Sequence, residues 1–365
     1  MKALFYQYPI LIGLVAFLLA LIIMPIVIRI AQAKGFVVRP NKRTSHIGEV
    51  PNIGGLGICF ATLMTYMFFE FEQLQQYQFL LIGLFAIMVV GLVDDILILS
   101  PLSKLLCELI AGIALIGFAD IRITHLHGIF GLDAIGIIPS YCLSFFILLA
   151  IINAINLIDG VDGLASGLGI LYCTFFAVYF DLVNELAWLI LALCLIGPLL
   201  VFFIYNVFGG KRRKLFMGDS GSLLLGYMMT AFVFHFCEIN AYQQVPDLFH
   251  ITAAPAVAIC VLGVPIFDTI RVSLTRIKHH KSPFVADKNH IHHLLLRTGL
   301  SHLQTTGVLL GVTCLSIALG VFGRNWNNWF LVGADFVLLA LLTFVLWRIL
   351  DFQDKKRQLT ANGIG

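Results

Sequence analysis

NAINLIDGVDG, residues 153–163, ends a long apolar run and is the stretch from which the fold is best deduced. If the run continues as a helix, Asn156, Asp159 and Asp162 recur every three residues and share one face, with neighbouring Cβ atoms about 5–6 Å apart. Oxygen donors at that spacing suit a hard cation such as magnesium or manganese. The alternative interpretation is a polar helix end, because Asp favours helix caps and Gly terminates helices.

The composition excludes an ordinary soluble domain. Hydrophobic residues make up 60% of the chain and charged residues 12%, and the mean hydropathy is +0.97. About 20 apolar residues in a helix cross a hydrocarbon core of about 30 Å, and backbone groups in lipid must pair within their own segment. The eight cysteines are scattered through apolar stretches without a Cys-x-x-Cys motif, which is typical of small core residues.

Eleven apolar segments are candidate membrane spans, so the sequence predicts an all-α polytopic membrane protein. Their approximate limits are 8–30, 53–70, 78–98, 104–120, 135–156, 163–180, 186–206, 221–237, 251–271, 304–322 and 329–348. The connections between them are short, which predicts a single membrane domain over residues 1–365 and no large soluble domain.

The basic residues predict the orientation, because cytoplasmic loops are enriched in Lys and Arg. With the N-terminus outside, 20 of the 23 Lys and Arg residues fall on the cytoplasmic side, and only Lys2, Arg122 and Arg324 fall outside. The sequence therefore predicts an N-out, C-in topology.

On this topology the polar motifs gather at the cytoplasmic face, where they predict an active site. They are Asp94-Asp95, then Asn156, Asp159 and Asp162, then Asp219, Asp268, and finally His290, His292 and His293. The predicted catalytic loops are about 31–52, 94–104, 156–163, 207–221 and 268–303.

Basic side chains at the same face imply an anionic substrate. They include Lys42, Arg43, Lys104 and Arg276. Carboxylates alone repel a phosphate, whereas carboxylates that hold a divalent metal beside Lys, Arg and His bind a diphosphate. Phosphoryl transfer requires mainly positioning and charge neutralisation. The alternative interpretation is that basic loops such as 211–214 only set the topology.

Structural interpretations compete with each motif. Acids are unfavourable at the C-terminal end of a helix, which favours a functional role for Asp94-Asp95. Helix capping alone explains an acid at Asp219. The histidines at 290, 292 and 293 resemble a zinc cluster, but no Cys or fourth ligand lies at a matching spacing, so phosphate contact is favoured over zinc.

Together these motifs resemble the polyprenyl-phosphate N-acetylhexosamine-1-phosphate transferase family, and within it the bacterial branch that uses undecaprenyl phosphate. The match covers about residues 34–300. The supporting motifs are RPNKR at 39–43 with residues 51–55, Asp94-Asp95 followed by Lys104, residues 153–164, FMGDSGS at 216–222, and SPF at 282–284 with DKNHIHHL at 287–294.

The resemblance implies a reaction. The phosphate of undecaprenyl phosphate attacks the β-phosphorus of UDP-N-acetylglucosamine, N-acetylglucosamine 1-phosphate moves to the lipid, and UMP leaves. It also implies roles: Asp219 and Asn156 bind Mg²⁺ or Mn²⁺, Asp94 and Asp95 position or deprotonate the lipid phosphate, Asp159 and Asp162 support the metal and nucleotide, and Lys104, Lys42, Arg43, Arg276, His290, His292 and His293 contact substrate phosphates.

The expected location is the bacterial inner membrane, in the first membrane step of a cell-surface glycan of the O-antigen or common-antigen type. Nucleic acid is not an expected partner, and the sequence neither requires nor excludes a homodimer. The spacer between Pro283-Phe284 and the histidines favours a plain N-acetylhexosamine over phospho-muramoyl-pentapeptide, and leaves the epimer open. A secondary transporter of organic anions and a metal-dependent lipid phosphatase are the alternatives from other classes.

Overall fold

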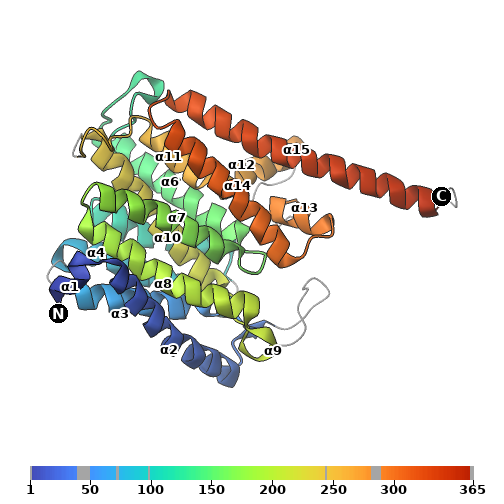
Figure 1. Cartoon of the computed structure of the whole chain (residues 1–365), viewed down its shortest axis with the longest axis horizontal. Helices are drawn as coiled ribbons and strands as arrows, with labels where there is room; N and C mark the ends of the chain where they lie inside the picture. The colour runs from blue at the N-terminus through green and yellow to red at the C-terminus, as the bar shows by residue number, and fades with distance from the viewer. Residues whose placement is uncertain are drawn as a thin grey trace.

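The computed structural model describes residues 2–38, 50–70, 74–97, 99–242, 245–280 and 289–361 as an elongated bundle of helices (Figure 1). The helices are α1 Lys2–Gln7, α2 Ile10–Lys34, α3 Gly54–Phe69, α4 Leu74–Leu97, α5 Pro101–Gly112, α6 Ile137–Ile158, α7 Leu164–Leu182, α8 Leu186–Phe208, α9 Gly210–Arg213, α10 Gly218–Ala241, α11 Ala254–Val261, α12 Gly263–Lys278, α13 Ile291–Arg297, α14 His302–Phe322 and α15 Asn328–Ala361. The remaining elements are strands β1 Val37–Val38 and β2 Val50–Pro51, the π-helix Ile113–Phe118 and the 3₁₀ turn Ile129–Gly131.

The protein is an all-α, multi-pass membrane protein. Each of the eleven predicted apolar segments coincides with a helix or helix pair. In the part of the chain that the structure describes, nine helices are long and apolar enough to cross a bilayer, and the pair α11–α12 makes a tenth if it counts as one span. The remaining predicted segment is α3, which has 16 residues and is shorter than a typical span.

The ninth predicted segment is bent where a straight span was expected. Helices α11 and α12 meet at an angle of 82° around Leu262. Pro265 lies just after the bend and has no N–H to donate to the carbonyl of Val261, which removes a helical hydrogen bond at this point. α12 then continues to Lys278, beyond the predicted limit.

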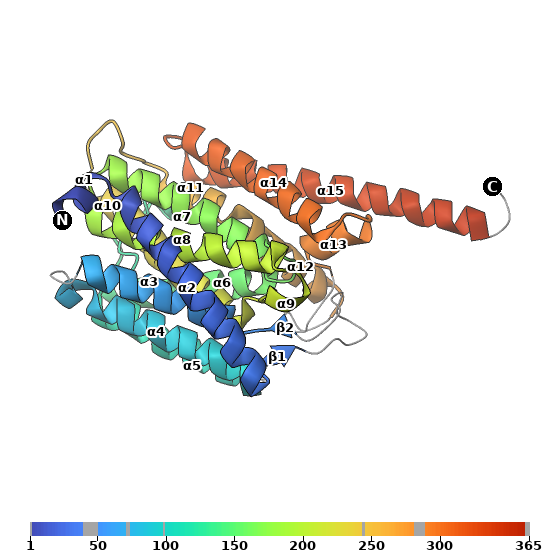
Figure 2. The ribbon, with the colours of Figure 1, turned by 60° about the horizontal axis from the view of Figure 1, so that its bottom comes forward.

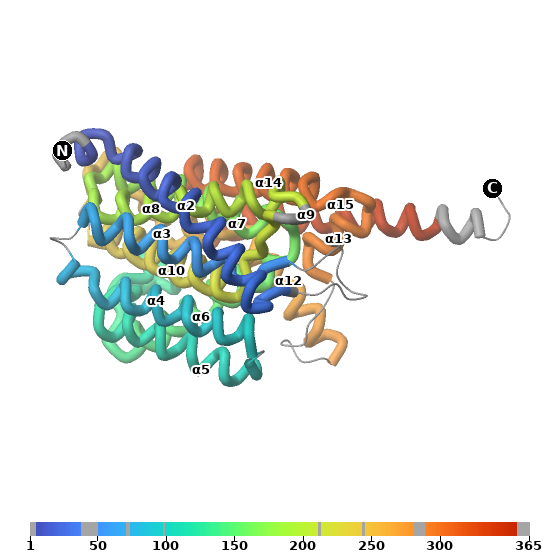
Figure 3. The backbone as a smooth tube through the Cα atoms, turned by 90° about the horizontal axis from the view of Figure 1, so that it is seen from below, coloured from blue at the N-terminus to red at the C-terminus, as the bar shows by residue number. Residues whose placement is uncertain are grey.

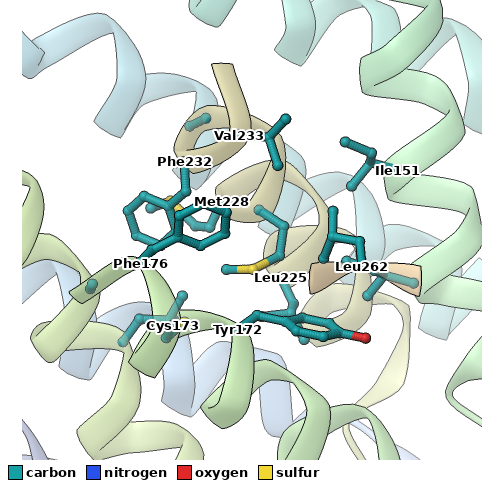
Figure 4. Packing of buried hydrophobic residues seen from close by; sticks show 14 of the residues in the cluster. Ile151, Tyr172, Cys173, Phe176, Leu225, Met228, Phe232, Val233 and Leu262 are labelled. Carbon is teal, nitrogen blue, oxygen red and sulfur yellow. The ribbon is translucent and has the colours of Figure 1, made fainter. Parts of the chain in front are cut away.

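Helix α10 forms the centre of the bundle. Nearly every residue from Ser220 to Asn240 is buried, and the helix packs against α3, α4, α6 and α7. Figure 4 shows Met228 and Phe232 of α10 beside Phe176 and Tyr172 of α7, with Ile151 of α6 nearby. The residues at the start of α10 are therefore held by several neighbouring helices at once.

Two glycines bring α3 and α4 into backbone contact with the first turn of α10. A Cβ added to Gly55 would lie 2.1 Å from the nitrogen of Gly221, and one added to Gly91 would lie 2.4 Å from the nitrogen of Ser220. Small residues permit this close approach of membrane helices. Asp95 follows Gly91 by one turn and is thereby placed at the N-terminus of α10.

A short antiparallel sheet, not predicted from the sequence, fastens the segment between α2 and α3 to the α9–α10 connection. Val37 pairs with Pro51 and Val38 with Val50. The N–H of Phe216 then donates to the carbonyl of Pro51 over 2.8 Å. The predicted phosphate-binding residues Lys42 and Arg43 lie between the strands, outside the described residues.

The polar ends of the helices gather at one end of the bundle. The sheet, α9, α12 and α13 lie together at the end remote from the N-terminus, and α15 projects beyond them (Figures 2 and 3). Four helix ends meet in the same region: the C-terminal ends of α4 and α6 and the N-terminal ends of α5 and α10. Contacts of Lys104 with Asp94 and Asp219, and of Asn156 with Asp219, join them.

Candidate functional site

The centre of the candidate site is an ammonium group surrounded by acidic and amide oxygens. Lys104 of α5 places its Nζ 3.0 Å from Asp94 Oδ2, 3.0 Å from Asp219 Oδ1 and 3.3 Å from Asn156 Oδ1. These residues come from the ends of α4, α10 and α6. The structure thus brings together four of the predicted site residues from distant parts of the sequence.

Asn156 and Asp219 are oriented by further hydrogen bonds. Asn156 Nδ2 donates to Asp219 Oδ1 and to Ser222 Oγ, the latter over 2.8 Å. Because its N–H groups face α10, its carbonyl oxygen faces Lys104. The Asp219 side chain is 31% exposed and that of Asp94 9%, so Asp219 is the more accessible acid to an incoming ligand.

The structure separates the two neighbouring acids Asp94 and Asp95, for which the same role was predicted. Asp95 accepts the backbone N–H groups of Asp219 over 2.8 Å and of Ser220 over 3.1 Å, so it caps the N-terminus of α10. Asn52 Nδ2 also donates to Asp95 over 2.8 Å. With these bonds Asp95 fixes the geometry of the site, while Asp94 contacts Lys104.

The expected helical face of Asn156, Asp159 and Asp162 is wrong. α6 ends at Ile158, Asp159 adopts φ −76° and ψ 67°, and Asp162 lies in the connection to α7. Gly163 has φ +77°, a left-handed conformation that favours glycine, and its N–H donates to Asn206 Oδ1 over 2.6 Å. The local sequence of Asp and Gly therefore ends the helix instead of extending it.

Asp162 is held by the side chains of Lys214 and His302. Lys214 Nζ lies 2.7 Å and His302 Nδ1 3.2 Å from its Oδ2. Burial raises the pKa of Asp162, but the hydrogen bonds from His302 and Lys214 outweigh this, so the pKa lies below its usual range. Asp162 is therefore ionised at neutral pH and fastens the connection between α6 and α7 to α9 and α14.

Asp159 has a different electrostatic environment. Burial raises its pKa to about 7, with additional contributions from the charges of Asp219, Asp95 and Asp162. Its carboxyl group is therefore partly protonated near neutral pH, which limits the repulsion among the acids. Any cation that binds nearby favours its ionised form.

The histidine motif is anchored to the buried acid Asp268 of α12. His290 Nδ1 lies 2.9 Å from Asp268 Oδ2, and Arg271 Nη2 lies 2.6 Å from Asp268 Oδ1. The N–H of Ile291 donates to both oxygens over 3.1 Å, which caps α13. His290 is 4% exposed, so its contact with Asp268 lies inside the protein and helps to hold the histidine motif on α12.

His292 connects the histidine motif to the NAINLIDGVDG stretch. Its ring packs against Gly160, where an added Cβ would lie 2.6 Å from Nε2. It is 1% exposed, and burial lowers its pKa to about 3, so its imidazole is neutral. His293, whose ring centroid is 4.2 Å from that of His292, is only half-buried and is the most accessible of the three for a phosphate.

We expect Gly160→Ala to lower turnover on the order of 100-fold, because the added methyl displaces a buried ring that positions the Asp159 connection. Initial rates of the purified variant measure this. Gly307→Ala is the matched control, since an added Cβ there meets nothing within 4 Å. Wild-type turnover in Gly160→Ala would contradict the assigned contact. Slower turnover in the double variant Gly160→Ala/His292→Ala than in His292→Ala alone would contradict it as well.

Arg276, the remaining predicted phosphate contact, is placed on α12 and is 6% exposed. Residues 281–288, which include Pro283 and Phe284, lie outside the described residues, as do Lys42 and Arg43. The structure therefore leaves their proposed contacts with substrate as predictions.

The oxygens around Lys104 fit a hard divalent cation. Magnesium prefers oxygen ligands, uses one or two carboxylates, and keeps waters or substrate phosphates for its other positions. Asp94, Asp219 and Asn156 supply three such oxygens around one point. Among the described residues, no group of three or more His, Cys, Asp or Glu side chains is arranged as a complete metal site.

Several residues of this region were missed or assigned only to topology. Asn52 and Ser222 lie within the quoted motifs but were given no role, Asn206 and His302 were not singled out, and Lys214 was explained by the positive-inside pattern. The partner of each lies 9 or more residues away in the sequence: Asp95 for Asn52, Asn156 for Ser222, Asp162 for His302 and Lys214, and Leu215 for Asn206. An ionised acid in a connection implies a counter-charge, but the linear sequence does not say which cation supplies it.

Comparison with known proteins shows similarity along most of the chain. Residues 77–236 match the model of glycosyl transferase family 4. The chain is 29% identical over 353 residues to the undecaprenyl-phosphate alpha-N-acetylglucosaminyl 1-phosphate transferase of Yersinia pestis, covering 92% of each chain. It is 30% identical over 350 residues to that of Haemophilus influenzae, covering 92% of each. A probable undecaprenyl-phosphate N-acetylglucosaminyl 1-phosphate transferase of Bacillus subtilis is 32% identical over 336 residues, with 91% and 89% covered.

The apolar helices and the similarity to these relatives together define a membrane-embedded transferase. The chain belongs to glycosyl transferase family 4. It is a sugar 1-phosphate transferase, which confirms the family resemblance deduced from its motifs.

Proposed function

We propose that the enzyme transfers N-acetylglucosamine 1-phosphate from UDP-N-acetylglucosamine to undecaprenyl phosphate, giving undecaprenyl-diphospho-N-acetylglucosamine and UMP. The observation that carries the proposal is the convergence of Asp94, Lys104, Asn156 and Asp219 at one end of an apolar bundle. A lipid phosphate carried in the bilayer reaches such a site from the side, and a nucleotide sugar reaches it from water. The names of the relatives support the lipid acceptor and the transferred N-acetylglucosamine 1-phosphate group.

In the proposed reaction, an oxygen of the lipid phosphate forms a bond to the β-phosphorus of the donor. The bond between that phosphorus and the bridging oxygen breaks, and UMP leaves with the electron pair. A phosphate monoester has a second pKa of about 6, so it is largely anionic at neutral pH and needs positioning more than deprotonation. Asp94 orients this acceptor, and Lys104 neutralises charge on the phosphates.

Asp219 and Asn156 would hold Mg²⁺ or Mn²⁺. When bound, this cation supplies charge neutralisation and orients the diphosphate. Asp159 and Asp162 keep the α6–α7 connection in place beside it, through the pairing of Asp162 with Lys214.

We further infer eleven spans with the N-terminus outside, an active site on the cytoplasmic face of the inner membrane, and a role in a surface-glycan pathway of the O-antigen or common-antigen type. The positions of 20 of the 23 Lys and Arg residues support the orientation.

Incubation of the purified protein with undecaprenyl phosphate and a panel of UDP-sugars tests the proposal. We expect UMP release with UDP-N-acetylglucosamine, only in the presence of the lipid, and its loss after EDTA. Preference for another UDP-N-acetylhexosamine or for UDP-muramoyl-pentapeptide would change the donor. Release of inorganic phosphate would identify a phosphatase, and uptake of an organic anion into vesicles without UMP would identify a transporter.

A further inference from the structure

One buried acid next to the site, Glu108, has no role in the proposed reaction. Glu108 lies one helical turn after Lys104 on α5, so the two side chains share a face of that helix. It is 1% exposed. The sequence did not single it out, because a lone Glu between apolar residues carries no motif.

Two hydrogen-bonded pairs of residues connect α5 to α6 at successive turns. Nearer the end of the bundle, Lys104 Nζ donates to Asn156 Oδ1 over 3.3 Å. One turn deeper, Asn153 Nδ2 donates to Glu108 Oε2 over 2.8 Å and also to the carbonyl of Leu149 over 2.9 Å. Asn153 therefore holds one oxygen of Glu108 in a fixed position below Lys104.

The other oxygen of Glu108 is available. Oε1 is buried and has no hydrogen-bond partner among the described residues. Leaving a buried acceptor without a hydrogen-bond donor costs free energy, so this oxygen favours contact with a donor group. Lys104 attracts Glu108 electrostatically, whereas Asp219 and Asp94 repel it.

Lys104 and a divalent cation compete for the same oxygens. The ammonium group of Lys104 lies 3.0 Å from Asp219 Oδ1 and 3.3 Å from Asn156 Oδ1, the two residues proposed to hold the cation. A cation at this point repels the ammonium group, which must then move. The lysine side chain is long and flexible, and Glu108 offers an unpaired acceptor on the same helix face.

We propose that Glu108 is a positioning residue that serves as the second counter-ion of Lys104, receiving its ammonium group when a divalent cation occupies the oxygens of Asp219 and Asn156. The inference rests on the proposed function. It explains how one lysine can neutralise the acids before the cation binds and still remain beside the phosphates afterwards.

Binding of Mn²⁺ to the detergent-solubilised full-length protein, followed by electron paramagnetic resonance, tests the proposal with a double-mutant cycle. Glu108→Gln keeps an acceptor for Asn153 but removes the charge. We expect it to weaken Mn²⁺ binding about tenfold in the wild-type background, because Lys104 then has no alternative counter-ion. In a Lys104→Met background the same change should alter binding less than about twofold.

Equal weakening in both backgrounds would overturn the proposal, because Glu108 would then act on the cation directly. No weakening in either, or no binding of Mn²⁺ by the wild type, would overturn it as well. Glu108→Asp keeps the charge and provides a second variant if Glu108→Gln does not fold; it should bind Mn²⁺ more tightly than Glu108→Ala. UMP release by the wild type is measured in parallel: an active enzyme without coupling refutes only the role of Glu108, whereas an inactive wild type refutes the proposed function.

Discussion

Asp219→Ala should lower turnover by about 1,000-fold or more, which is a typical cost for losing a group that stabilises transition-state charge. The carboxylate contacts Lys104 and Asn156 and is the more exposed of the two acids around the ammonium group. Its removal takes an anionic ligand from the proposed cation and a partner from the lysine. Initial rates of UMP release at several Mg²⁺ concentrations measure the effect.

Asp247→Ala is the matched control, because Asp247 is an exposed acid in the connection after α10, outside the candidate site. It should leave turnover unchanged. Near-normal activity of Asp219→Ala at low Mg²⁺ would remove Asp219 from the cation site. A variant that unfolds gives no information on catalysis, so the thermal unfolding midpoint of each protein is recorded, and Asp219→Asn, which preserves the shape, is tested alongside.

Gly91→Ala should destabilise the protein and inactivate it together. The added methyl would lie 2.4 Å from the backbone of Ser220, so α4 must move away from α10. Overpacking of this kind costs typically 1–3 kcal/mol in folding free energy. The same movement withdraws Asp95 from the N–H groups of Asp219 and Ser220, which misplaces the site.

The unfolding midpoint in detergent and the rate of UMP release check this pair of effects. Gly333→Ala of α15 is the control, because an added Cβ there meets nothing within 4 Å. A Gly91→Ala protein with the wild-type midpoint and rate would show that α4 and α10 do not approach each other as described. Loss of stability with a normal rate would separate the helix contact from the site.

The membrane architecture could be predicted because it depends on local composition. Each predicted apolar segment became a helix or a helix pair, since lipid leaves the backbone no other way to satisfy its hydrogen bonds. The bend between α11 and α12 could also have been predicted from the sequence, because Pro265 lacks the N–H that a helical hydrogen bond needs. The gathering of Asp94, Asn156 and Asp219 followed from alternating the spans, because each lies at a helix end on one predicted side.

The different structural roles of these residues could not be predicted from the sequence. Asp94 and Asp95 are adjacent in sequence, and the backbone contact at Gly91 is what directs Asp95 to the first turn of α10. Asp and Gly end α6 at Ile158, as the alternative interpretation allowed, but the partners that hold the following connection, Asn206 for Gly163 and Lys214 for Asp162, lie far along the chain. Such choices are made by tertiary contacts, which have no periodic signature along the chain.

The cap that Asp95 provides for α10 has a consequence for biosynthesis. The acid enters the membrane with α4, but the N–H groups it accepts belong to Asp219 and Ser220, more than 120 residues later. While only α4 through α8 have been inserted, Asp95 therefore lacks the N–H groups that it accepts in the folded protein, and the candidate site is incomplete. We therefore expect the nascent protein to become active only after α10 has been inserted and packed against α4.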